Sequence, residues 1–171
     1  RLVHDPEKII FHGRKLGIAC NLVHFLDISE RIFSQRISNL LVENSIHYWD
    51  ESKRDGFYDL DGKLQIRLNN KKILIINSES KLNYETKISI FSKDKSIEYN
   101  WENGYLYQNE QEIGKIDISY QSERTSIVVQ DILSGEEPKI AKLDKAIRLH
   151  YHLIDILQPS WEDFYKNKLK K

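Results

Sequence analysis

The segment GIACNLVHFLDI, residues 17–28, places three polar side chains on one stripe of an expected helix. Asn21, His24 and Asp27 follow one another at intervals of three residues, and residues with this spacing lie on the same helix face. A solvated face normally carries Lys and Glu, whereas an amide, an imidazole and a carboxylate can form a hydrogen-bonded set that transfers a proton. His24 is the candidate acid–base residue, because an imidazole titrates near neutral pH.

A purely structural role for the same residues is the alternative. His24 would then be a half-buried helix residue bonded to Asp27, and Asp27 would pair with Arg31 one turn later. Such a pair on a helix surface stabilises by only a few tenths of a kcal/mol.

The single cysteine and the late histidines do not extend this set. Cys20 lacks a second His nearby in sequence, and a buried cysteine is usually inert packing rather than a nucleophile. His150 and His152 are two positions apart, so they point to different faces of a helix and cannot act as an i, i+4 metal pair. We expect no metal site.

Two cations stand in a turn that ends at Gly56. Lys53 and Arg54 would bind a carboxylate or phosphate group of a substrate, since Arg offers a bidentate fork. A solvated turn explains the same pair equally well.

Hydrophobic periodicity predicts the elements that hold these residues. A helix is expected over about 18–35, with Leu22, Leu26 and Phe33 on its buried side. Residues 1–15 read as polar and irregular. Alternating apolar residues predict strands over 39–49, 63–69, 71–77, 85–92, 96–101 and, as a short pair, around 105–118.

Helices return near the end, over 122–133 and 138–157. The second carries apolar residues at helical spacing, Ile140, Leu143, Ala146, Ile147, Ile154 and Leu157, together with His150. Pro159 is expected to end it, and Ser160 to begin a short final helix.

This order predicts an α+β domain, a largely antiparallel open sheet of about six strands with helices packed on one face. The second face would carry Ile66 or Ile88, with Tyr99 and Trp101, in some alternation. Such a face is either exposed to solvent or packed against another subunit.

The composition and the motifs of the chain argue against several classes of function. Lys and Arg total 26 and so do Asp and Glu, which argues against nucleic acid as a partner. One cysteine favours the cytoplasm, and no apolar run is long enough to cross a membrane. No G-x-G-x-x-G or Walker loop occurs. Methionine is absent even at position 1, so we expect the chain to be part of a longer protein.

Two segments resemble a known family. GIACNLVHFLDI is similar to the start of the C-terminal domain of Gfo/Idh/MocA-type oxidoreductases, where an acidic or amide residue precedes a His that is followed by Asp. WDESKRDGFYDLDGKLQI, residues 49–66, resembles a branch with a Lys-Arg-x-Gly-Phe element before an acidic residue and a hairpin. The helix with His150 fits the family's closing helix, so the resemblance spans about 15–157.

The resemblance implies a glyceraldehyde-3-phosphate-dehydrogenase-like C-terminal domain, with 1–171 as one substrate-binding and oligomerisation domain. The whole enzyme would use NAD or NADP and act on a sugar or polyol hydroxyl. The N-terminal Rossmann domain with its catalytic Lys is missing, so this chain alone would bind no cofactor and be inactive. A homodimer or higher homo-oligomer through the open sheet face is expected.

The resemblance also assigns roles within the stripe. His24 would exchange a proton with the substrate hydroxyl, Asn21 would bind or orient that hydroxyl, and Asp27 would hold the imidazole. Many members carry Asp one turn before this His, where this chain has Cys20 and Asn21. Two alternatives stay open: a free-standing α+β binding or interaction module without catalysis, and a small-molecule domain with a closed pocket between sheet and helices.

Overall fold

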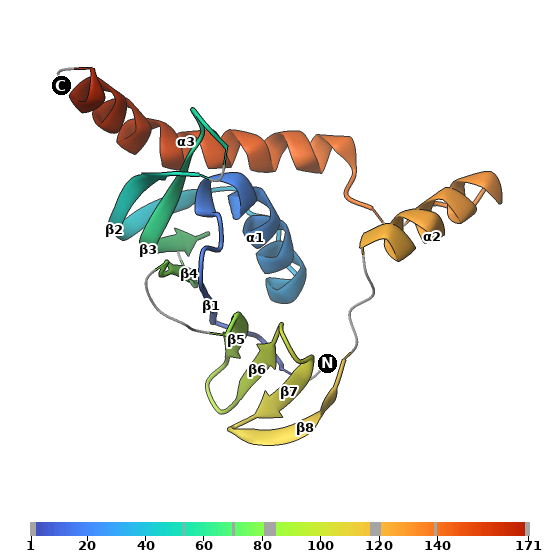
Figure 1. Cartoon of the computed structure of the whole chain (residues 1–171). Coiled ribbons are helices and arrows are strands. Elements are labelled where there is room, and N and C mark those ends of the chain that lie inside the picture. The colour runs from blue at the N-terminus through green and yellow to red at the C-terminus, as the bar shows by residue number, and fades with distance from the viewer. Residues whose placement is uncertain are drawn as a thin grey trace.

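A computed structural model describes residues 3–52, 54–69, 71–80, 85–116, 121–138 and 140–169. Lys53, one of the two candidate anion-binding residues, lies outside the described residues. Within them, eight strands form one sheet in the order β2-β3-β4-β1-β5-β6-β7-β8, accompanied by three helices (Figure 1). The strands are β1 Lys8–Gly13, β2 Leu40–Glu51, β3 Tyr58–Leu68, β4 Lys72–Ser78, β5 Lys87–Phe91, β6 Ser96–Asn100, β7 Tyr105–Gln108 and β8 Gln111–Lys115. The helices are α1 Ile18–Phe33, α2 Gln121–Leu133 and α3 Leu143–Lys168.

Strand β1 occupies the centre of the sheet, so the prediction that residues 1–15 are irregular is wrong over this strand. It runs parallel to β4, with Ile9 beside Leu74, and antiparallel to β5. The other described pairings are antiparallel, which confirms a largely antiparallel sheet, with eight strands in place of about six. The apolar run IIF in β1 is too short to show a period of two, and its partners lie far away in sequence.

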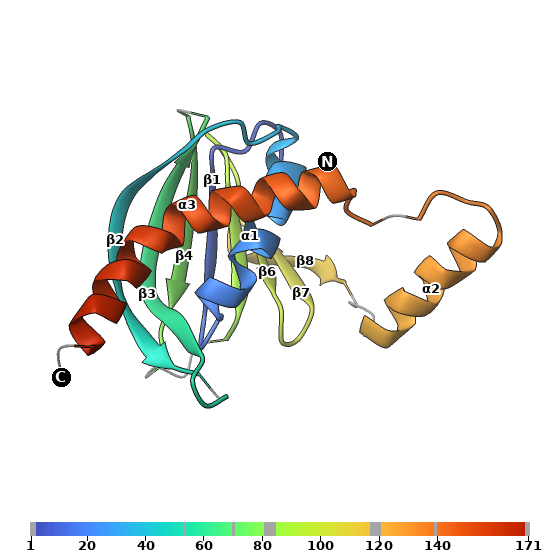
Figure 2. The same ribbon diagram turned by 90° about the horizontal axis from the view of Figure 1, so that it is seen from above.

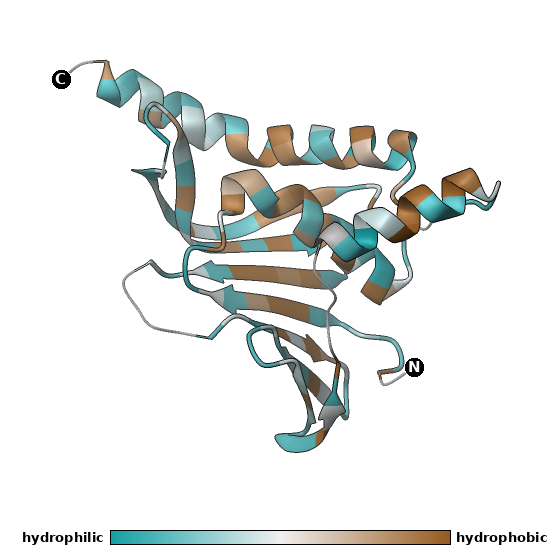
Figure 3. Ribbon diagram, turned by 45° about the vertical axis from the view of Figure 1, so that its right-hand side comes forward, coloured by the Kyte–Doolittle hydropathy of each residue, from teal (hydrophilic) through white to brown (hydrophobic). Residues whose placement is uncertain are grey.

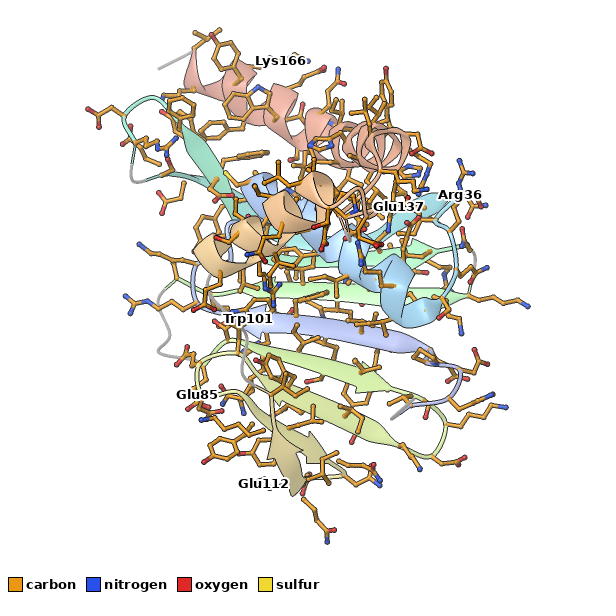
Figure 4. The ribbon with its side chains drawn as sticks, turned by 90° about the vertical axis from the view of Figure 1, so that its right-hand side faces the viewer. Arg36, Glu85, Trp101, Glu112, Glu137 and Lys166 are labelled. Atoms are coloured by element: carbon orange, nitrogen blue, oxygen red, sulfur yellow. The ribbon has the colours of Figure 1, made fainter. Side chains whose placement is uncertain are left out.

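Helices α1 and α3 pack on one face of the sheet (Figure 2). The predicted burial of Leu22, Leu26 and Phe33 is confirmed, since their exposures are 0%, 0% and 8%. Alternate strand residues complete this core, including Ile9, Phe11, Leu60, Leu64, Ile66, Leu74, Ile76 and Ile88. Figure 4 shows the breadth of the sheet, with Lys166 of α3 near one edge and Glu112 of β8 at the other.

The opposite face carries other residues than those predicted. Ile66 and Ile88 belong to the core under the helices, so their assignment to the second face is wrong. Because successive strand residues point to opposite faces, Ile10, Ile73 and Ile75 lie on the second face, where each is half-buried. Helix α2 stands apart from the sheet, as Figures 1 and 2 show.

Helix α3 continues through Pro159, and the predicted break there is wrong. Proline removes one backbone donor, but contacts with β2 hold the following turn in place. The indole Nε1 of Trp49 donates to Ser160 Oγ at 3.0 Å, and the rings of Trp49 and Trp161 lie 5.0 Å apart. Here the tertiary contacts of Trp49 outweigh the tendency of Pro159 to end the helix.

The buried side of α3 matches the predicted stripe only at Leu157. Leu149 and Ile156, which were not in that stripe, face the core with it. Leu143 and Ile147 are 75% and 48% exposed. The helix thus carries apolar residues on both its buried and its exposed side, and the sequence does not tell which side meets the sheet. Figure 3 shows apolar segments along α3 in brown. Among the described residues, none of the helices has the length and apolar character that crossing a membrane requires.

Candidate functional site

A pocket of about 420 Å³ lies between the N-terminus of α1 and the adjoining ends of β2 and β3. Its lining combines cations, carboxylates and ring surfaces, a composition suited to a polar ligand with an apolar face. Lining residues that matter below are Lys15, Gly17, Cys20, Arg54, Phe57 and Asp59.

Asp59 of β3 anchors the start of α1. Its Oδ1 accepts hydrogen bonds from the N–H groups of Ala19 and Leu60, both at 2.8 Å. Gly17, the residue before the helix, has no side chain that could cap it. The Asp59 carboxylate from the neighbouring strand serves as the cap instead. Its negative charge is favourable at a helix N-terminus. The only sequence signal for Asp59 is its place as the acidic residue after the Lys-Arg-x-Gly-Phe element.

Asp61, two residues further along β3, ties three strands together beneath the pocket. It is 6% exposed and accepts hydrogen bonds from Ser78 Oγ, the Ser80 N–H and the Tyr48 hydroxyl at 2.6, 2.8 and 2.9 Å. Burial opposes ionisation, but these hydrogen bonds outweigh it and hold the pKa of Asp61 below its ordinary value. This carboxylate is therefore a structural part of the pocket floor.

Asn21 lies beside the pocket and braces the turn between β1 and α1. Its Nδ2 donates to the Leu16 carbonyl at 2.7 Å. A Cβ on Gly17 would lie 3.0 Å from Asn21 Nδ2 and 3.0 Å from Asp59 Oδ2. The structure thus brings Asn21 together with Asp59, a residue that sequence reasoning had not assigned.

His24 and Asp27 follow on α1 with different surroundings. The His24 side chain is exposed. Asp27 Oδ2 pairs with Arg31 Nε at 3.1 Å and Oδ1 with Lys145 of α3, and these cations lower the pKa of Asp27 although burial opposes them. The Asp27–Arg31 pair of the structural alternative is therefore present. The acid–base role of His24 stays a prediction.

Cys20 and Arg54 share the pocket wall. Burial and the nearby Asp59 charge raise the pKa of the Cys20 thiol, and Arg54 opposes them only in part. At neutral pH the group is a thiol rather than a thiolate, which makes it a poor nucleophile. Arg54 is exposed and lines the pocket, a position that suits the predicted contact with an anionic ligand group.

The described residues contain no group of three or more His, Cys, Asp or Glu side chains placed to hold a metal ion. They also do not fit a dinucleotide at the turn from β1 to α1. A pyrophosphate binds the free N–H groups of a helix N-terminus. Here the Ala19 N–H already donates to the Asp59 carboxylate, so it is not free to bind one.

No family model and no curated protein matches this sequence. Solved structures do match its fold. UDP-N-acetylglucosamine 3-dehydrogenase GnnA from Acidithiobacillus ferrooxidans has 10% sequence identity and a TM-score of 0.63, over 88% of this chain and 52% of that chain. The dehydrogenase MviM from Clostridium difficile has 12% identity and a TM-score of 0.55, over 91% and 55% of the two chains.

A putative oxidoreductase from Thermotoga maritima is similar as well, with 10% identity and a TM-score of 0.52, over 89% of this chain and 52% of its own. The chain therefore spans about half the length of these proteins. The comparison confirms the expected fold class, an α+β fold that this chain shares with these dehydrogenases.

Proposed function

We propose that this chain is the substrate-binding and oligomerisation domain of an NAD(P)-dependent oxidoreductase that acts on a sugar or polyol hydroxyl. The pocket at the N-terminus of α1, in a fold that dehydrogenases share, carries this proposal. NAD or NADP would be held by a separate N-terminal Rossmann domain, because the described residues do not fit a dinucleotide.

The pocket has the groups that a sugar derivative requires. Lys15 and Arg54 would attract a phosphate or carboxylate substituent, and Arg54 would bind it through its guanidinium fork. The rings of Phe57 and Tyr58 would cover an apolar face of the sugar. His24, exposed one turn along α1 from Cys20, would exchange a proton with a substrate hydroxyl.

Two titrations test this proposal. NADH or NADPH added to the chain alone should give no calorimetric heat, and micromolar binding would count against a cofactor held by another domain. UDP-N-acetylglucosamine, suggested by the name of the similar dehydrogenase, should shift the NMR amide signals of Gly17, Cys20 and Arg54. Shifts confined to residues outside the pocket would contradict the assignment.

A matched pair of variants sharpens the second titration. Arg54→Ala should weaken binding of UDP-N-acetylglucosamine but not of neutral N-acetylglucosamine, because only the first carries a phosphate. Arg36→Ala removes the same charge from an exposed position beyond the other end of α1 and should leave both affinities unchanged.

A free-standing interaction module is the second candidate. Its support is the apolar surface on α2, where Ile127, Ile132 and Leu133 are 53%, 57% and 82% exposed. The gene upstream of Arg1 separates the two candidates. A G-x-G-x-x-G segment between a strand and a helix would support the enzyme, and a start codon directly before Arg1 would support the module.

A further inference from the structure

Asp59 has an oxygen that the fold does not use. Oδ1 accepts the N–H groups of Ala19 and Leu60, which completes the helix cap. Oδ2 accepts no hydrogen bond from the described residues, and Asp59 lies in the pocket lining. Capping alone needs one acceptor, so the second oxygen is available to a ligand.

The Asn21 amide is also only partly used. Nδ2 carries two hydrogens, and its one hydrogen bond among the described residues goes to the Leu16 carbonyl at 2.7 Å. A second N–H remains, close to the pocket and on the same side of α1 as Gly17.

Both unused groups lie around one point beside Gly17. The position that a Gly17 Cβ would occupy is 3.0 Å from Asp59 Oδ2 and 3.0 Å from Asn21 Nδ2. The two atoms are therefore no more than about 6 Å apart, and they do not hydrogen-bond to each other. A hydroxyl on the pocket side of Gly17 can lie about 3 Å from each of them, within hydrogen-bond reach of both.

We propose that Asp59 and Asn21 form a clamp for one hydroxyl group of a polyhydroxylated ligand. The hydroxyl donates to Asp59 Oδ2 and accepts from Asn21 Nδ2. A hydrogen bond to a carboxylate is charge-assisted and therefore stronger than one between neutral groups. The clamp rests on the proposed function and adds Asp59 to it as a substrate-binding residue.

The variant Asp59→Asn removes the proposed clamp but keeps the helix cap. The amide oxygen of the variant still accepts from Ala19, but its NH2 group cannot accept a hydroxyl hydrogen. Asp55→Asn is the matched control, since it removes the same charge from an exposed position in the same hairpin, away from the pocket lining.

The probes are UDP-N-acetylglucosamine and its analogues that each lack one ring hydroxyl, titrated calorimetrically into the chain. The wild-type chain should bind the parent at least about tenfold more tightly than one of the deoxy analogues, the effect expected for a hydrogen bond to a charged group. D59N should bind both equally, at the level of that analogue, whereas D55N should discriminate as the wild type does. A purely structural role for Asp59 would weaken parent and analogue alike.

D59N that still prefers the parent would overturn the clamp and leave the proposed function standing. A wild-type chain that binds no probe would instead count against the proposed function. If D59N does not fold, Asn21→Ala provides the same comparison, and undiminished discrimination by N21A would overturn the clamp.

Discussion

At the residue scale, Glu30 joins α1 to α3 and to the loop that follows α1. Its side chain is 7% exposed, and it accepts the Ile37 N–H at 2.7 Å. It also pairs with Arg148 at 2.7 Å and with Lys145 at 3.2 Å. Burial opposes ionisation, but these contacts outweigh it, so the pKa of Glu30 lies below its ordinary value.

Glu30→Gln should therefore weaken the fold and reduce its sensitivity to acid. A carboxylate whose pKa is lower in the folded chain stabilises it above the unfolded pKa of about 4.5, and this stabilisation is lost as the pH falls through the folded value. We expect E30Q to cost about 3 kcal/mol at pH 7 in urea unfolding, because it leaves two cations with a weaker partner. The difference from the wild type should shrink at pH 3.

Glu162→Gln is the control for that measurement. Glu162 is exposed and pairs with Lys166 one turn later, so its loss should cost no more than about 0.5 kcal/mol. A constant difference between E30Q and the wild type from pH 7 to pH 3 would contradict the role given to the Glu30 carboxylate.

The candidate site was predictable only where its residues are neighbours in sequence. Asn21 was found because it shares a helix stripe with His24. Asp59 was not assigned, because its contact with Ala19 joins residues 40 positions apart and depends on how β3 passes the start of α1. No periodic pattern carries that information.

At the scale of elements, the C-terminal half of α3 is attached to β2 and β3 by aromatic rings. Trp161 contacts Trp49 at 5.0 Å and Tyr58 at 5.9 Å between ring centroids, and Phe164 contacts Tyr58 at 5.1 Å. Tyr58 also lines the pocket. The position of this half-helix therefore supports one pocket wall.

Trp161→Ala should lower the free energy of unfolding by about 2 kcal/mol, less than for a fully buried tryptophan, because Trp161 is only half-buried. Hydrogen exchange should also speed up at the paired ends of β2 and β3. Tyr151→Ala on the same helix is the control, since Tyr151 is 65% exposed and should matter little. Unchanged hydrogen exchange in W161A would show that α3 does not support this pocket wall.

Elements with long periodic patterns were predicted well, as α1 and the hairpin of β3 and β4 show. The continuation of α3 through Pro159 was not, because it depends on Trp49 and Ser160, which lie on different elements. Local rules describe what a segment prefers alone, and here a contact between distant segments outweighs that preference.

At the scale of the whole molecule, the sheet face opposite α1 and α3 is the proposed oligomer interface. Ile10, Ile73 and Ile75 lie half-buried at its centre. We expect a two-fold dimer through this face, because such a contact is the commonest way for a chain to cover an apolar surface with its own copy.

Light scattering at micromolar concentration should give twice the chain mass of 20.3 kDa. Ile75→Lys should yield a folded monomer, because a charge would be buried without a partner in the interface. Ile147→Lys on the exposed stripe of α3 is the control and should stay dimeric. A monomeric wild type would refute the dimer, and dissociation by I147K alone would place the interface on α3.

The central position of β1 has a consequence for how the chain folds. Ile9 pairs with Leu74, about 65 residues later, and β1 is the only link in the sheet order between β2–β4 and β5–β8 among the described strands. On the ribosome, β1 is synthesised before β4 and has no partner until β4 has emerged. Closing so long a loop is slow, so we expect the hairpins on either side to form first and the insertion of β1 to limit the folding rate.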